Sequence, residues 1–127
     1  MNEMSQKSVL IVEDDEALNE AFSMVLTHAG YAVRTVFNGQ EGLDAIEDSE
    51  PDLVILDLLM PVMDGKEFLE KLDRKHTMPV VVMSNLDSKS EIQKALDLGA
   101  TRYILKAWAS PKELVSVVQD TLADAAK

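Results

Sequence analysis

The sequence contains no cysteine, few aromatic residues and about half as many basic as acidic residues. The absence of cysteine excludes a disulfide framework, a thiolate zinc site and a cysteine nucleophile, and it fits a reducing compartment. No apolar run approaches the roughly 18 residues of a membrane-spanning helix, and the polar start, which includes Glu3, shows no signal peptide. A formal net charge of −11 disfavours contact with nucleic acid or anionic membranes. We therefore expect an acidic cytoplasmic protein.

The 127 residues suit one domain, which we expect to span 1–127 with a core of about 7–124. Four short apolar runs are continuous rather than alternating, a pattern typical of strands with both faces buried in a parallel sheet. A fifth, alternating segment predicts a less buried strand. The four runs are Val9–Val12, Leu53–Leu56, Val80–Met83 and Tyr103–Leu105, and the fifth segment is Tyr31–Phe37.

Helical spacing of apolar residues follows each strand, and capping residues mark several helix starts. Asn38, Ser88 and Ser110 each precede a glutamate by three residues, and Pro111 suits a first helical position. Five alternating strand and helix units predict an α/β fold: a doubly wound five-stranded parallel sheet with helices on both faces. We expect the flavodoxin-like strand order 2-1-3-4-5.

Polar residues follow four of the five strands, at the edge where such sheets bind ligands. They are Glu13, Asp14 and Asp15 after the first strand, Asp57 after the third, Ser84 and Asn85 after the fourth, and Lys106 after the fifth. Converging carboxylates repel one another unless a cation intervenes, and oxygen ligands without histidine or cysteine favour Mg²⁺ or a similar ion. Such a site suits phosphoryl chemistry, in which a carboxylate can itself be the nucleophile.

Each residue also has a purely structural interpretation. Asp14 or Asp15 would serve as a helix cap, which taken alone is the commoner role. Asp57 and Ser84 would suit turns, and Lys106 a solvated surface. The combination favours a shared functional site over separate structural roles, because four independent strand ends supply polar groups that suit one cation and phosphoryl site.

The chain resembles the receiver domain of bacterial two-component response regulators, in particular the chemotaxis-regulator type, over about Val9 to Leu122. The most specific motif begins at Asp57, with Pro61 four residues later and Gly65 eight residues later. The remaining matches are the acidic pair Asp14 and Asp15, the hydroxyl residue Ser84, the lysine Lys106 and the switch aromatic Tyr103.

This resemblance implies that Asp57 accepts a phosphoryl group from a phosphohistidine of a histidine kinase or a histidine phosphotransfer protein. It implies Mg²⁺, with Mn²⁺ as a substitute, bound by Asp15, Asp57 and the backbone carbonyl of Leu59, while Asp14 acts mainly through water. Lys106 and Ser84 would contact the phosphoryl oxygens.

The resemblance also implies a switch. Ser84 would move toward the phosphoryl group and Tyr103 would turn inward, altering the face of the fourth helix, fifth strand and fifth helix for a downstream protein or output domain. Periodicity alone favours a half-buried strand residue at Tyr103. Trp108 is interpreted mainly as a packed loop anchor, with a partner contact as the alternative. The protein would be a monomer or a phosphorylation-dependent dimer.

Three departures from the family pattern bear on activity. Ala107 replaces the usual proline, so we expect a trans peptide bond and a changed loop that shifts Lys106. Asn85 stands where a small residue is usual, and it would either narrow access to Asp57 or donate a hydrogen bond to a phosphoryl oxygen. Leu59 and Leu86 cannot orient an attacking water, which predicts slow loss of the phosphoryl group. Leu86→Glu and Leu59→Asn should then accelerate that loss.

Other classes fit less well. A haloacid-dehalogenase-type phosphatase needs a second aspartate where Leu59 stands. A flavodoxin-type FMN protein needs a phosphate-binding loop where Glu13, Asp14 and Asp15 would repel phosphate. A receiver-fold interaction module that acts without phosphorylation remains the alternative function. Within the receiver interpretation, both a stand-alone regulator and the receiver of a longer protein remain open.

Overall fold

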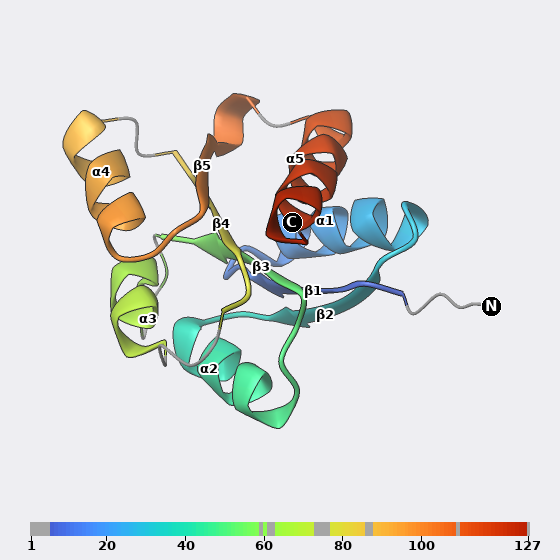
Figure 1. Cartoon of the computed structure of the whole chain (residues 1–127), viewed down its shortest axis with the longest axis horizontal. Helices are drawn as coiled ribbons and strands as arrows, with labels where there is room; N and C mark the ends of the chain where they lie inside the picture. Colours follow the sequence, from blue (N-terminus) through green and yellow to red (C-terminus); the bar gives the residue numbers. More distant parts are fainter. Residues whose placement is uncertain are drawn as a thin grey trace.

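A computed structural model of the chain describes residues 6–58, 60, 63–72, 77–85, 88–108 and 110–126, with Trp108 described by its backbone alone. Within these residues, five parallel strands form one sheet in the order β2-β1-β3-β4-β5, as predicted. Figure 1 shows this sheet with helices on both of its faces. The strands are β1 (Ser8–Val12), β2 (Ala32–Val36), β3 (Leu53–Asp57), β4 (Val80–Ser84) and β5 (Arg102–Leu105).

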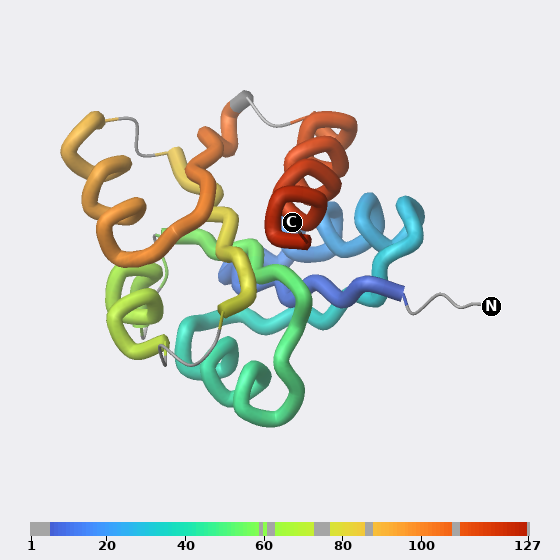
Figure 2. Tube along the Cα trace, viewed as in Figure 1, coloured from blue at the N-terminus to red at the C-terminus, as the bar shows by residue number. Residues whose placement is uncertain are grey.

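The helices lie between successive strands, and the last one follows β5. They are α1 (Glu16–His28), α2 (Gly39–Asp48), α3 (Gly65–Lys71), α4 (Lys89–Asp97) and α5 (Pro111–Ala125), with a short 3₁₀ helix η1 (Lys106–Trp108) before α5. In Figure 2 the chain can be followed from β1 through α1 to β2, and then back across the sheet to β3, β4 and β5. This reversal of direction between β1 and β3 is the topological switch point of the sheet.

Local sequence signals fix the helix starts. Each α-helix has an N-cap side chain that accepts a hydrogen bond from the backbone N–H three residues later. Asn38, Ser88 and Ser110 do so as predicted. Gly30 and Gly99, which follow α1 and α4, have φ angles of 106° and 112°, a left-handed conformation that glycine adopts without a Cβ clash.

The two faces of the sheet bury separate clusters of apolar side chains because successive strand residues point to opposite faces. Leu10 and Val12 of β1 face α2, α3 and α4, where they meet Phe68. Val9 and Ile11 face α1 and α5, where they meet Leu26 and Leu114. β1, β3 and β4 are almost completely buried, which explains their continuous apolar sequences.

The prediction for the run that forms β5 was wrong in one respect. Its continuous apolar sequence suggested burial of both faces, whereas all four residues of β5 are only half-buried. The physical reason is its position, since β5 lies at the edge of the sheet and pairs only with β4. Among the described residues, no helix combines the length and apolar character needed to cross a membrane.

Candidate functional site

The candidate site lies where the carboxyl ends of β1, β3, β4 and β5 meet. Glu13 follows directly after β1, Asp57 is the last residue of β3, and Ser84 is the last residue of β4. Lys106 follows β5 as the first residue of η1. Because the strands are parallel neighbours, these four residues come to one edge of the sheet from distant parts of the chain.

Three carboxylates converge at this edge. Glu13, Asp14 and Asp57 each offer one oxygen, and these oxygens lie within 4.8 Å of one another. Glu13 and Asp57 are buried, whereas Asp14 is accessible to solvent. A set of hard oxygen donors at this spacing fits Mg²⁺ or Mn²⁺, and the accessible side leaves room for water ligands.

Lys106 joins two of the three carboxylates. Its Nζ lies 2.7 Å from Oε1 of Glu13 and 3.1 Å from Oδ2 of Asp57. Burial by itself would lower the pKa of Lys106, but its hydrogen bond to Glu13 and the charge of Asp57 outweigh burial and raise it. Lys106 therefore stays cationic and offsets part of the negative charge gathered around Asp57.

Glu13 is held at both of its carboxylate oxygens. Oε1 faces Lys106, and Oε2 accepts a hydrogen bond from the backbone N–H of Asp15 at 3.1 Å. Burial raises the pKa of Glu13 to about 7, against the lowering effects of the Lys106 and Asp15 hydrogen bonds. In the metal-free protein Glu13 therefore binds a proton up to near neutral pH, and a cation that uses Glu13 as a ligand would have to displace this proton.

The structure places Asp14 and Asp15 differently from the predicted acidic pair. Asp14 joins the carboxylate cluster, but the exposed Asp15 side chain is the N-cap of α1 and accepts the N–H of Leu18 at 3.1 Å. Glu13 takes the second position beside Asp14 instead. The family resemblance did not include Glu13 among the site residues, although Glu13 follows the first strand directly. The signal that would have found it is its position directly after the last buried residue of β1.

Ser84 and Tyr103 lie on neighbouring strands beside the cluster. Ser84 is fully buried at the end of β4, next to Met83, which pairs with Asp57. Tyr103 is half-buried in β5, pairs with Val82 and packs against the core on the α4 side of the sheet. Tyr103 is therefore a half-buried strand residue, as periodicity alone predicts.

The structure describes two of the departures noted in the sequence, Ala107 and Asn85. No cis peptide bond occurs among them, so Lys106 and Ala107 are joined in trans as expected. Lys106 nevertheless reaches Glu13 and Asp57, and Ala107 and Asn85 are exposed. Three predictions concern Leu59, Leu86 and the side chain of Trp108. All lie outside the described residues and stay predictions.

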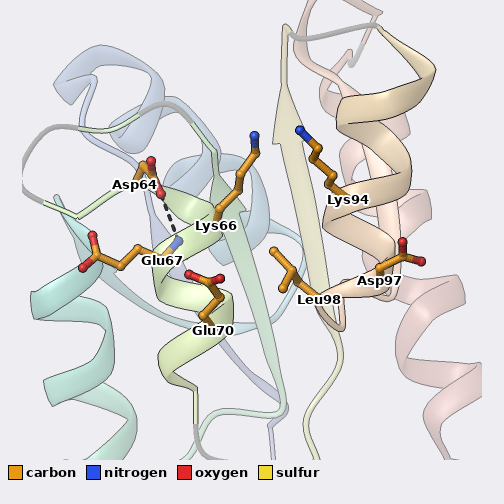
Figure 3. Close-up of a pocket in the computed structure, with 7 residues that line it drawn as sticks. All are labelled: Asp64, Lys66, Glu67, Glu70, Lys94, Asp97 and Leu98. Carbon is orange, nitrogen blue, oxygen red and sulfur yellow. Dashed lines mark hydrogen bonds between the residues drawn. The ribbon is translucent and has the colours of Figure 1, made fainter.

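A charged cavity of about 610 Å³ lies between α3 and α4. Figure 3 shows Lys66 and Lys94 extending toward the same end of this cavity from the two facing helices, with Glu70 and Leu98 nearer its other end. The carboxylate of Glu91 binds the Nζ of Lys66 at 2.6 and 2.9 Å, which links α4 to α3. This cavity is separate from the carboxylate cluster and contains none of its residues.

The cluster of Glu13, Asp14 and Asp57 lies at the switch point of a doubly wound sheet, which is where proteins of this fold bind their ligands. The family model of the response regulator receiver domain matches residues 9–119. The chain therefore belongs to the response regulator receiver domain family, as the sequence motifs predicted.

Solved structures agree with this assignment. A CheY-like receiver domain protein from Methanospirillum hungatei JF-1 is 30% identical with a TM-score of 0.89, and the match covers 95% of this chain and 97% of that chain. The receiver domain of a signal transduction histidine kinase from Syntrophus aciditrophicus is 31% identical with a TM-score of 0.84, covering 93% and 91%. The Vibrio cholerae chemotaxis protein CheY4 is 28% identical with a TM-score of 0.86, covering 92% and 99%.

Proposed function

We propose that this receiver domain accepts a phosphoryl group on Asp57 from a phosphohistidine, in a reaction that requires Mg²⁺. The observation that carries the proposal is the contact of Lys106 with both Glu13 and Asp57 beside an accessible third carboxylate, Asp14. This arrangement supplies a nucleophile, ligands for a hard cation and a fixed positive charge at one point.

Each residue of the site would have a separate role in phosphoryl transfer. A carboxylate oxygen of Asp57 attacks phosphorus, a new P–O bond forms and the P–N bond to the donor histidine breaks. The histidine nitrogen keeps the bonding electrons. Glu13, Asp14 and Asp57 would hold the cation, which when bound neutralises charge on the phosphoryl oxygens. Lys106 and Ser84 would contact those oxygens.

The resulting change would spread through β4 and β5. Ser84 pairs with Leu105, two residues beyond Tyr103 on β5, and we expect movement of Ser84 toward the phosphoryl group to let Tyr103 turn inward. An altered α4–β5–α5 face would then signal to a downstream protein or to an output domain. The phosphoryl donor would be a histidine kinase or a histidine phosphotransfer protein acting in the cytoplasm. The similar structures include both a chemotaxis protein and a domain of a histidine kinase. Both a stand-alone regulator and the receiver of a longer protein therefore remain open.

Intact mass spectrometry after incubation with acetyl phosphate and Mg²⁺ tests the proposal. One added phosphoryl group, absent in Asp57→Ala and in a sample with EDTA, is the expected result. Lys106→Met should retain the acceptor but react much more slowly. No addition to the wild-type chain, from acetyl phosphate or from a phosphorylated histidine donor, would contradict the proposal and favour a receiver fold that acts without phosphorylation.

A further inference from the structure

The turn that connects β1 to α1 carries two of the three clustered carboxylates, yet it consists of only residues 13–15. Such a short segment has no regular secondary structure to fix it. Its conformation must therefore be set by contacts with the surrounding elements, and these contacts determine where Glu13 and Asp14 point.

Asn19, the fourth residue of α1, contacts this segment at both of its ends. Its side-chain Nδ2 donates to the carbonyl oxygen of Glu13 at 3.0 Å, and its backbone N–H donates to the carbonyl oxygen of Asp15 at 2.9 Å. Asn19 is only 2% exposed, so these bonds form away from solvent. A buried hydrogen bond that is lost leaves an unsatisfied polar group, and the backbone shifts to relieve it.

The same amide also attaches the turn to β2. Nδ2 makes a second hydrogen bond, 3.0 Å long, to the carbonyl oxygen of Val36, which is the last residue of β2. That oxygen also accepts the backbone N–H of Glu13 at 3.1 Å. A primary amide has two N–H donors, so both donors of Asn19 are used on carbonyl oxygens.

Glu13 is therefore fixed from two sides. Val36 and Asn19 hold its backbone, while Lys106 and the N–H of Asp15 hold its carboxylate. We propose that Asn19 is a positioning residue that sets the orientation of Glu13 and Asp14 for cation binding. The inference rests on the proposed function, because it concerns the same cation site. Partners that orient metal ligands typically change metal affinity by about 10–100-fold when they are removed.

Asn19→Leu tests the inference, since leucine has a similar volume and no side-chain donor. Thr121→Val is the matched control. Thr121 is fully buried in the second half of α5, and its hydroxyl donates to the carbonyl oxygen of Val117 at 2.7 Å, so valine also removes one buried hydrogen bond. Calorimetric titration of the metal-free proteins with MgCl₂ gives the affinity, and urea unfolding in EDTA gives the stability.

We expect Asn19→Leu to bind Mg²⁺ about tenfold more weakly than the wild type. Thr121→Val should lose stability but keep the wild-type affinity. If Asn19→Leu does not fold, Asn19→Ser, which keeps one donor on a shorter side chain, should show the same loss in a folded protein. Wild-type affinity in the folded Asn19 variant, or an equal loss in Thr121→Val, would overturn the inference. A wild-type protein that binds no Mg²⁺ and accepts no phosphoryl group would instead overturn the proposed function.

Discussion

At the scale of single residues, the site depends on which acidic side chain after β1 reaches Asp57. Asp14 and Asp15 are adjacent and chemically identical, yet one joins the carboxylate cluster and the other caps α1. Their different environments lead to opposite expectations for the same substitution.

Asparagine substitutions separate these two roles. Because Mg²⁺ binds the folded state, it should raise the free energy of unfolding, by about 1.4 kcal/mol at tenfold excess over the dissociation constant. We expect Asp14→Asn to remove most of this increment. Asp15→Asn should keep it, since asparagine is also a good N-cap. Thermal unfolding with MgCl₂ or EDTA measures the increment. Loss of the increment in Asp15→Asn but not in Asp14→Asn would show that Asp15, and not Asp14, binds the cation.

The raised pKa of Glu13 predicts a pH dependence of the metal-free protein. A carboxyl group whose pKa is about 7 in the folded state, above its ordinary 4.5, binds its proton more tightly when folded. Its contribution is therefore complete below about pH 4.5 and is lost as the pH rises toward 7. Between about pH 5 and pH 8 the expected loss is on the order of 2–3 kcal/mol. Urea unfolding in EDTA between about pH 5 and pH 8 should show this fall in the wild type. Glu13→Gln, which has no proton to lose, should show a flatter profile.

At the scale of elements, the junction between β3 and α3 controls the position of Asp57. A Cβ atom on Gly65 would lie 2.6 Å from Cα of Leu58 and 2.8 Å from the carbonyl oxygen of Asp57. These are backbone atoms, so the strand end itself would have to move. This close approach explains why the motif requires glycine eight residues after the phosphoacceptor.

Gly65→Ala should therefore reduce both stability and phosphorylation. Overpacking of this kind costs about 1–3 kcal/mol, and displacement of Asp57 should slow its reaction with acetyl phosphate. Gly99→Ala is the control, because its φ of 112° strains alanine while no atom lies within 4 Å of the added Cβ. Urea unfolding and the phosphorylation rate should both change in Gly65→Ala, whereas Gly99→Ala should change stability alone. Equal rates in the two variants would contradict the argument.

The ion pair between Lys66 and Glu91 links α4 to α3, and the side chains of the pair are 32% and 27% exposed. The hydrogen bond from Lys66 lowers the pKa of Glu91, so the contribution of the pair is present above the ordinary glutamate pKa and is lost as the pH falls. We expect Lys66→Met to speed amide hydrogen exchange in α4. Lys71→Met is the matched control, since Lys71 pairs with Glu67 within α3. Exchange in α4 that is equally fast in both variants, or unchanged in Lys66→Met, would show that the pair does not restrain α4.

At the scale of the whole molecule, a net charge of −11 on 127 residues opposes compaction. Screening by NaCl should therefore raise the free energy of unfolding in EDTA, while the buried contacts of Lys106 are screened less than surface pairs. Replacing the exposed residues Glu20, Asp48 and Asp120 by their amides brings the net charge from −11 to −8. Urea unfolding across a salt series should show a smaller salt effect in this variant. An unchanged or opposite effect would show that local ion pairs outweigh the overall repulsion.

The amino-acid sequence was sufficient to predict three of the five helix starts, the parallel sheet and the residues Asp57, Ser84 and Lys106 at its edge. These features depend on local capping, on burial patterns and on the rule that parallel strands end at one edge. Three features were decided by tertiary structure: the half-burial of β5, the position of Glu13 in the carboxylate cluster, and the hydrogen bonds of Asn19 to the turn after β1. They depend on where a strand lies in the sheet and on which neighbours a side chain meets across it. Periodicity along the chain carries no information about such contacts.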